Sequence, residues 1–373
     1  MLEKIIFKGY KSFKEKYELE LKPITILFGK NSSGKSSLVK LPTLIEGALS
    51  MKFEEPLRFI NKGIELGAEY RDLFYQREYQ SSINFQLYQN KNKLDLSIVN
   101  SSSEKKVIIT NWYFECESYK KNISTEQLSK YSFKGFLTEQ NLSSKCFSLK
   151  TNYLGPFRIK PKRIFYINSF SNSSSIGKKG AIAYDLIAKD EELETKVSEW
   201  FKNNFDGWEL FVDRKTPYYE IKIRRDSKSE AINIVDVGQG MSQSLPIIIK
   251  ALSDYNNDDT LNIIEQPELH LHPAAHGNLA ELIFNSYKNY NQKYLIETHS
   301  ENFILRLRTL IAKGNLDIND INLYFVDFDE KENSSSLRKI KIDTLGDVDD
   351  WPEEIFNESF EETKALIKAQ KEK

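Results

Sequence analysis

Apolar residues in this chain fall into two patterns, and each pattern predicts a different kind of strand. Short, mainly apolar runs at 24–28, 261–264 and 294–296 are typical of strands buried inside a sheet. Between about residues 71 and 165, apolar and polar positions alternate instead, as they do in antiparallel hairpins. The hairpin pattern is clearest on the two sides of one polar turn, at Ile83, Phe85, Leu87, Leu94, Leu96 and Ile98. "VIITNWYFEC" (107–116) and "KCFSLKTNY" (145–153) continue in the same style.

Apolar residues at helical spacing mark segment 190–205, where one face carries side chains that we assign to core packing: Leu193, Val197, Trp200, Phe201 and Phe205. A length of 373 residues suits two closely packed lobes. We therefore predict an α/β fold with a mixed central sheet, helices and an antiparallel β-rich lobe or insert. The expected divisions are an N-terminal lobe at 1–70, the β-rich lobe at 71–165, a helical linking region at 166–230, a C-terminal lobe at 231–330 and a small tail domain at 331–373.

Candidate phosphate-binding chemistry lies directly after the first apolar run. "GKNSSGKS" (29–36) matches G-x-x-x-x-G-K-[ST], a spacing that lets backbone N–H groups surround phosphates at a helix N-terminus. The alternative is a Gly/Ser-rich turn without function, but the flanking apolar strand and apolar helix favour the functional interpretation. Lys35 is expected at the β- and γ-phosphates of ATP, and the Ser36 hydroxyl is expected to ligate Mg²⁺. The predicted nucleotide-binding residues here are Gly29, Lys30, Asn31, Ser32, Ser33, Gly34, Lys35 and Ser36.

A second glycine pair, Gly238 and Gly240, stands between a predicted strand and an apolar helix, with Ser242 placed to cap that helix. An ordinary strand–helix turn is the alternative interpretation. An exposed helix N-terminus at this point could instead meet an anion, such as the γ-phosphate of ATP held by another subunit.

The segment "LNIIEQPELHLHP" (261–273) ends its apolar run at Glu265, which we expect to hold Mg²⁺ directly or through water. Gln266 could orient an attacking water but cannot take its proton as a carboxylate could. Glu268 is the nearest further carboxylate. His270 and His272 alternate beside Glu268, which leaves a separate metal site open, although no further ligand has suitable spacing.

"ETHS" (297–300) follows the last of the three apolar runs. His299 at the end of this predicted strand could sense the γ-phosphate or the attacking water. A helix-capping turn with an incidental histidine is the alternative.

The charge balance gives nucleic acid or lipid no general attraction, because 53 Lys and Arg residues nearly equal 54 Asp and Glu residues. We interpret the basic clusters "RIKPKR" (158–163) and "KIRR" (222–225) as solvated strand ends, with a nucleic-acid groove as the alternative. Cys116 and Cys146 have neither metal-ligand spacing nor a disulfide framework. The start "MLEKIIFK" lacks a signal-peptide core and no apolar run nears 18 residues, so a cytoplasmic protein without a membrane span is expected.

Taken in order, these motifs resemble those of the ABC-type ATPases of the SMC/RecF/OLD-like class, often labelled AAA ATPases, which are P-loop NTPases. The motifs that carry the resemblance are "YKSF", "GKNSSGKSS", "LGPFR", "IGKKG", "VGQGMSQSLP", "EQPELHLHP" and "ETHSENF", and they extend over nearly the whole chain. The tail "GDVDDWPEEIFNESFEE" is similar to a small C-terminal domain of unknown function found in one subgroup.

The resemblance implies roles for the matching positions. Residues 29–37, which include Ser37, correspond to the Walker A loop, Glu265 to the Walker B acid and His299 to the switch histidine. The signature motif, which contacts ATP across a dimer interface, corresponds loosely to Gly238, Gly240, Ser242 and Gln243. Gln266 stands where the catalytic glutamate is usual, so brisk hydrolysis is in doubt, and the signature differs from the LSGGQ form of transporters.

The leading hypothesis is an ATPase with ATP and Mg²⁺ that forms a homodimer around the nucleotide, with Gln266, Glu268 and His299 as candidate catalytic residues. We recognise no nuclease motif after His299, so a nuclease would be a separate effector protein, as in PtuA-like two-component phage-defence systems; DNA repair is the other setting. DNA binding is open. An ATP-dependent structural clamp with negligible hydrolysis is the alternative, supported by Gln266, and a transporter subunit is a third interpretation.

Overall fold

A computed structural model describes residues 1–78, 81–101, 106–117, 119–138, 146–166, 175–254, 260–352, 355–356 and 358–371. Within these residues, six strands form a central sheet in the order β12-β17-β18-β3-β19-β20. The strands are β12 (Lys150–Leu154), β17 (Thr260–Glu265), β18 (Lys293–Glu297), β3 (Ile24–Gly29), β19 (Ile321–Asp329) and β20 (Ser334–Ile340). All neighbours pair in parallel except β19 and β20. The three predicted apolar runs and the mixed central sheet are therefore confirmed.

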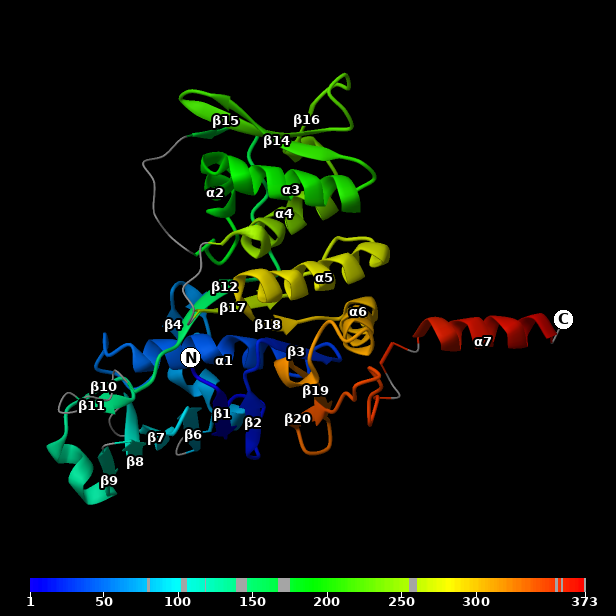
Figure 1. Ribbon diagram of the computed structural model, residues 1–373. Coiled ribbons are helices and arrows are strands. Elements are labelled where there is room, and N and C mark those ends of the chain that lie inside the picture. The colour runs from blue at the N-terminus through cyan, green and yellow to red at the C-terminus, as the bar shows by residue number, and fades with distance from the viewer. Residues whose placement is uncertain are drawn as a thin grey trace.

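Helices cover both faces of this sheet (Figure 1). On one face, α1 (Lys35–Leu49) packs between the central sheet and a second sheet, in a core that includes Leu27 of β3. The next residue of β3, Phe28, points to the opposite core, formed with α2 (Ala183–Lys189), α3 (Glu191–Asn204), α4 (Gln239–Leu252), α5 (Pro273–Tyr290) and α6 (Glu301–Ala312). Because side chains alternate along a strand, a run that is apolar at most positions on both faces suits a sheet covered on both sides.

The predicted antiparallel lobe is present as a sheet in the order β2-β1-β6-β7-β8-β9. Its strands are β1 (Lys4–Lys8), β2 (Tyr17–Glu20), β6 (Ser82–Gln89), β7 (Asn92–Ser101), β8 (Lys106–Cys116) and β9 (Tyr119–Ile123). The predicted hairpin is confirmed, with Leu87 opposite Leu94. Short strand pairs flank this lobe: β4 (Ile60–Asn61) with β5 (Ile64–Glu65), and β10 (Phe133–Lys134) with β11 (Leu137–Thr138). The lobe unites strands from both sides of residue 70.

One strand was assigned to the wrong sheet. We expected "KCFSLKTNY" to continue the antiparallel lobe, but its last residues form β12, which pairs in parallel with β17 in the central sheet. The polar residues Thr151 and Asn152 are buried there beside Tyr153, so this strand lacks the exposed face of a hairpin strand.

The region 166–230, expected to be helical, contains α2 and α3 but also a small antiparallel sheet. That sheet consists of β13 (Phe165–Tyr166), β14 (Glu209–Lys215), β15 (Tyr218–Arg224) and β16 (Ile232–Asn233). The predicted apolar face of α3 is confirmed by the burial of Leu193, Val197 and Phe201. The apolar pattern of "RIFYINSF" (163–170) predicts a strand, and the structure describes this segment only as far as Tyr166, since 167–170 lie outside the described residues.

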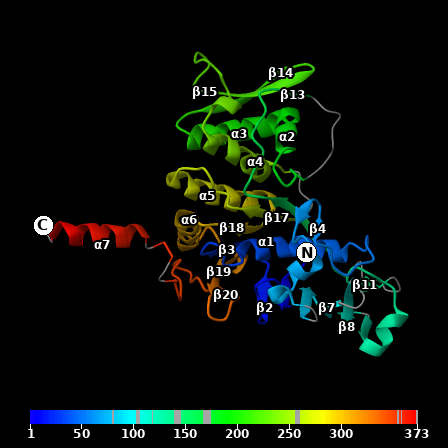
Figure 2. The same ribbon diagram turned by 180° about the vertical axis from the view of Figure 1, so that it is seen from behind.

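Two aromatic residues of the tail pack on the Walker A strand: Trp351 and Phe356 stack on Phe28, with ring centroids 5.3 and 6.2 Å away. Beyond them, α7 (Glu358–Lys371) projects away from the body of the molecule in both views (Figures 1 and 2). Among the helices of the described chain, none combines the length and the apolar character needed to cross a membrane.

Candidate functional site

The predicted phosphate loop joins the end of β3 to the start of α1. Two of its glycines are needed for the conformation. Gly29 has φ of 151° and a Cβ there would lie 2.0 Å from the Val326 carbonyl oxygen, and Gly34 has φ of 102°. The first turn of α1 carries no acidic residue and Gly34 supplies no side-chain cap. A helix N-terminus without a side-chain cap or an acidic residue favours an anion at the loop.

Lys35 of this loop is buried and folds back on the loop's own oxygens. Its Nζ donates to the Gly29 carbonyl at 2.9 Å, to the Lys30 carbonyl and to Ser33 Oγ at 3.4 Å. Burial lowers the pKa of the Lys35 ammonium. A phosphate group entering the loop would replace these neutral acceptors with charged ones, a gain in electrostatic energy for the bound state.

Ser36, the predicted Mg²⁺ ligand, donates its hydroxyl to Glu297 at the end of β18, with Oγ 3.1 and 3.0 Å from the two carboxylate oxygens. Burial and then the Glu265 carboxylate raise the pKa of Glu297. Sequence reasoning missed Glu297 as a site residue. The available signal was its position as an acid at the end of an apolar run, the same signal that identified Glu265.

Glu265 ends β17 directly opposite Glu297 in the register of the two strands, and it is buried. Its Oε1 accepts the Tyr153 hydroxyl at 2.6 Å and lies 3.7 Å from Lys40 Nζ. Burial raises the pKa of Glu265, against the opposing effects of Tyr153 and Lys40. The structure thus brings the loop, Glu265 and Glu297 together at the carboxyl edge of the parallel strands.

Gln266 adopts the left-handed region, with φ of 45°, which is uncommon for a residue with a Cβ. Three hydrogen bonds fix the backbone at Glu265 and Gln266. The Gln266 N–H donates to the Glu297 carbonyl at 2.7 Å, and Arg158 Nη2 donates to the carbonyls of Glu265 and Gln266 at 2.8 and 2.9 Å. Arg158 is only 5% exposed, and burial lowers its pKa to about 10. Our interpretation of 158–163 as a solvated cluster is wrong for Arg158, because its guanidinium is buried and Nη2 bonds these two carbonyls.

Glu268 and His299 meet through the backbone. Glu268 Oε1 accepts the His299 N–H at 2.7 Å, and burial raises the pKa of Glu268. His299 Nε2 lies 4.0 Å from Glu297 Oε1, and burial followed by the charge of Lys35 lowers the His299 pKa to about 4. His299 is therefore neutral near pH 7.

The alternative metal site at Glu268, His270 and His272 does not form in the described part of the chain, where no cluster of three potential metal ligands occurs. His272 instead caps α5 by accepting the Ala274 N–H at its Nδ1, 3.3 Å away. Glu268 is turned toward the His299 backbone.

The second glycine pair sits at the start of α4, on the opposite face of the central sheet from α1 (Figure 1). Our prediction that Ser242 caps α4 is wrong, because the helix begins at Gln239 with Gly238 as its N-cap, and Ser242 Oγ bonds the Gln239 carbonyl within the first turn. Ser242 and Gln243 are buried, whereas Gly238 is exposed. A Cβ on Gly240 would lie 2.8 Å from the His270 carbonyl, so α4 packs closely on the loop after β17.

Residues 1–304 match the sequence family described as "AAA ATPase domain". The chain belongs to this family. Residues 316–366 match a second family, described as a protein of unknown function (DUF3696), as the tail motif predicted. A search of curated proteins gave no match.

Solved SMC head domains share the fold of this AAA ATPase domain. An SMC head bound to the C-winged helix domain of ScpA has 13% identity and a TM-score of 0.53, with 91% of this chain and 98% of that chain covered. An SMC head with an extended coiled coil, bound to the C-terminal domain of ScpA derived from Pyrococcus furiosus, has 12% identity and a TM-score of 0.50, covering 91% and 96%. At these identities the likeness shows the fold, an ABC-type P-loop ATPase fold.

The donor set of the AAA ATPase domain fits Mg²⁺ and ATP. A serine hydroxyl and two carboxylates are the hard oxygen ligands that Mg²⁺ prefers, and the two glycines with positive φ shape the backbone cradle that phosphates need. Ser36, Glu265 and Glu297 would hold the ion, which when bound neutralises phosphate charge.

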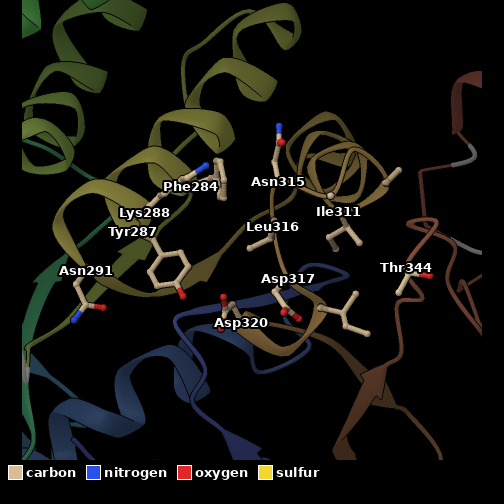
Figure 3. Close-up of a pocket in the computed structure, with 13 residues that line it drawn as sticks. Phe284, Tyr287, Lys288, Asn291, Ile311, Asn315, Leu316, Asp317, Asp320 and Thr344 are labelled. Atoms are coloured by element: carbon tan, nitrogen blue, oxygen red, sulfur yellow. The ribbon is translucent and has the colours of Figure 1, made fainter.

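The structure also has cavities that lie apart from the phosphate loop. One, of about 620 Å³, lies between the ends of α5 and α6 and the start of β19, and Figure 3 shows Tyr287, Asp317 and Asp320 in its wall. It is at the opposite edge of the parallel sheet from the loop, and its lining contains none of the predicted site residues. A second cavity, of about 370 Å³, lies at the start of α4 and is lined in part by Gly238, Gly240 and His272.

Proposed function

We propose that this chain is a nucleotide-gated ATPase that dimerises head to tail, with ATP and Mg²⁺ held between the phosphate loop of one subunit and α4 of the other. The observation that carries the proposal is the exposed start of α4, on the opposite face of the sheet from α1. A Cβ added at Gly238 would meet no atom within 4 Å, and the 370 Å³ recess lies beside it. A helix N-terminus without acidic residues favours an approaching anion.

Binding of ATP would favour the closed dimer, because the contacts between nucleotide and α4 exist only in that state. Gly238 and the backbone of the first turn supply these contacts. Ser242 and Gln243 act indirectly, since their side chains are buried within the subunit.

Hydrolysis is slow in this proposal. The Gln266 amide can orient water but takes no proton, and the buried Glu268 carboxylate, which accepts the His299 N–H, is the assisting group. Opening of the closed dimer then depends on this slow hydrolysis step, so the protein would act as a switch with a long-lived ATP-bound state.

The ATP-bound dimer controls a separate effector protein, such as a nuclease, in phage defence or DNA repair. A solved SMC head is bound to a domain of a second protein, ScpA, and this supports partner binding by a related fold as an analogy. DNA binding is tested by a mobility shift of the ATP-bound dimer at low and high salt, because phosphate contacts weaken as salt rises.

A structural clamp with negligible turnover is the second candidate, favoured by the amide at position 266. The deciding experiment measures phosphate release and molar mass by light scattering, with and without ATP, for wild type, Lys35→Ala and the exposed control Lys331→Ala. The gated ATPase is supported if wild type and Lys331→Ala both hydrolyse ATP and form dimers with ATP, whereas Lys35→Ala does neither. Dimers without turnover support the clamp, and a monomer that hydrolyses ATP contradicts both.

A further inference from the structure

The Walker A serine and an acid of the neighbouring strand form the closest contact between the phosphate loop and the carboxylates. Ser36 Oγ lies 3.1 and 3.0 Å from the two oxygens of Glu297. β18, which carries Glu297, is the immediate neighbour of β3, whereas β17 with Glu265 is one strand further away.

Glu265 has other partners. The Tyr153 hydroxyl and Lys40 Nζ contact the same oxygen, Oε1, at 2.6 and 3.7 Å. These contacts turn the acid at the Walker B position toward β12 and α1.

The backbone fixes Glu297 from both sides. Its carbonyl accepts the Gln266 N–H at 2.7 Å, and the following residue, Thr298, donates its N–H to the Leu27 carbonyl at 3.0 Å. The Glu297 side chain is 3% exposed. Its carboxylate is therefore held beside the loop before any ligand arrives.

The spacing suits a shared cation. Two adjacent ligands of an octahedral Mg²⁺ with bonds of about 2.1 Å lie about 3 Å apart, close to the separation of Ser36 Oγ and Glu297. A hydroxyl has two lone pairs and one hydrogen, so Ser36 can give a lone pair to the ion and still donate to a carboxylate.

We propose that Glu297, together with Ser36, is the principal protein carboxylate at the Mg²⁺ of the bound nucleotide, and that Glu265 has the lesser role. This inference rests on the ATP binding of the proposed function but not on dimerisation.

The test measures the affinity of a fluorescent, nonhydrolysable ATP analogue in EDTA and in Mn²⁺. The proteins are wild type, Glu297→Gln, Glu265→Gln and the control Glu281→Gln, which alters a surface ion pair with Arg306. We expect Glu297→Gln to reduce the gain in affinity from Mn²⁺ by about tenfold or more, with Glu265→Gln reducing it less. Affinity in EDTA should be kept or improved, because one negative charge near the phosphates is removed.

Two results would overturn the inference. One is a Glu297→Gln protein in which Mn²⁺ raises the affinity for the analogue to within about threefold of the increase seen in wild type. The other is a Glu265→Gln protein that loses more of this increase than Glu297→Gln does. Circular dichroism of each variant and the EDTA affinity separate loss of the metal site from misfolding, and Glu297→Asp, which keeps the charge, should lose less than Glu297→Gln. In a double-mutant cycle of Ser36→Ala and Glu297→Gln, the two effects on the affinity gained from Mn²⁺ should be non-additive. If the wild-type protein binds the analogue with Mn²⁺ but stays monomeric, the proposed gating by dimerisation is contradicted. The assignment of Glu297 at the metal would still stand.

Discussion

Arg158 Nη2 donates to the Gln266 carbonyl at 2.9 Å, so a residue that follows β12 fixes the peptide between Gln266 and Pro267, one residue beyond the buried acid of β17. The same nitrogen bonds the Glu265 carbonyl. Since Gln266 holds a strained left-handed conformation, these bonds help to maintain it. Arg158 is thus a positioning residue, acting through the backbone of Gln266.

Replacement of Arg158 by Met should lower kcat for ATP by at least about tenfold while KM changes by less than about threefold, because the turn that carries Gln266 loosens and the phosphate loop does not. Arg158→Lys should restore part of the rate. Steady-state phosphate release measures both constants, and Arg163→Met, at an exposed ion pair with Asp236, is the control. Equal changes in kcat for both variants would contradict the positioning role.

Gln266→Glu should raise ATP turnover by about tenfold or more, since a carboxylate can take the proton that the amide leaves on water. Glu268→Gln should lower turnover, because it removes the assisting carboxylate. Rates of single and double variants, measured under saturating ATP, check both effects. An unchanged rate in Glu268→Gln would show that Glu268 has no assisting role.

Gly238→Glu should leave folding and ATP binding of the monomer intact but abolish ATP-induced dimers. Its φ of −56° accepts any side chain and the surrounding space is open, so only a second subunit would meet the new carboxylate, which would repel phosphate. Light scattering with ATP is the measurement, with Gly238→Ala as the matched control. Normal dimers in Gly238→Glu would exclude this end of α4 from the interface.

Gly240→Ala, unlike the changes at Gly238, should affect folding of the monomer and lower its free energy of unfolding by about 1–3 kcal/mol. The new Cβ would lie 2.8 Å from the His270 carbonyl, so the loop after β17 or the start of α4 must shift. Urea denaturation compares it with Gly238→Ala, which should be near wild type. A stability equal to that of Gly238→Ala would mean that the loop yields without cost.

Lys250→Met should raise the free energy of unfolding at pH 7 by about 1–3 kcal/mol. Burial in α4 lowers the Lys250 pKa from 10.5 to about 8, so the unfolded chain holds this proton more tightly than the folded one. The contribution of Lys250 to stability therefore improves as pH rises from about 8 to 10.5. The advantage of the variant should shrink over the same range.

Urea denaturation at pH 7 and pH 10, with the exposed Lys288→Met as control, checks this prediction. An advantage of Lys250→Met that is equal at both pH values would contradict the burial argument.

The sequence was sufficient for features set by local chemistry. The strand, glycines and helix of the phosphate loop are contiguous, so their spacing alone predicts their geometry, and Glu265 is identified by the apolar run before it. The alternation of the hairpin at 82–101 likewise depends on neighbouring residues.

Features that depend on distant segments were missed. Tyr153 and Arg158 reach the site only because β12 pairs with β17, more than a hundred positions later in the chain, and a tyrosine or arginine in a polar stretch carries no sign of that pairing. Ser242 was misplaced for a local reason: glycine can also begin a helix, and the N-cap of α4 lies four residues earlier than the serine suggests.

The order of strands in the central sheet also governs biosynthesis. β3 lies between β18 and β19, which are translated long after it. At about 5–20 residues per second, a ribosome takes roughly 15–60 s to supply both partners, and until then β3 has two unpaired edges. The antiparallel lobe has all its strands far earlier, since they end at Ile123. The nascent chain therefore contains every strand of the antiparallel sheet before its nucleotide site is complete, and any product that stops before Lys293 lacks the strands on both sides of its Walker A strand.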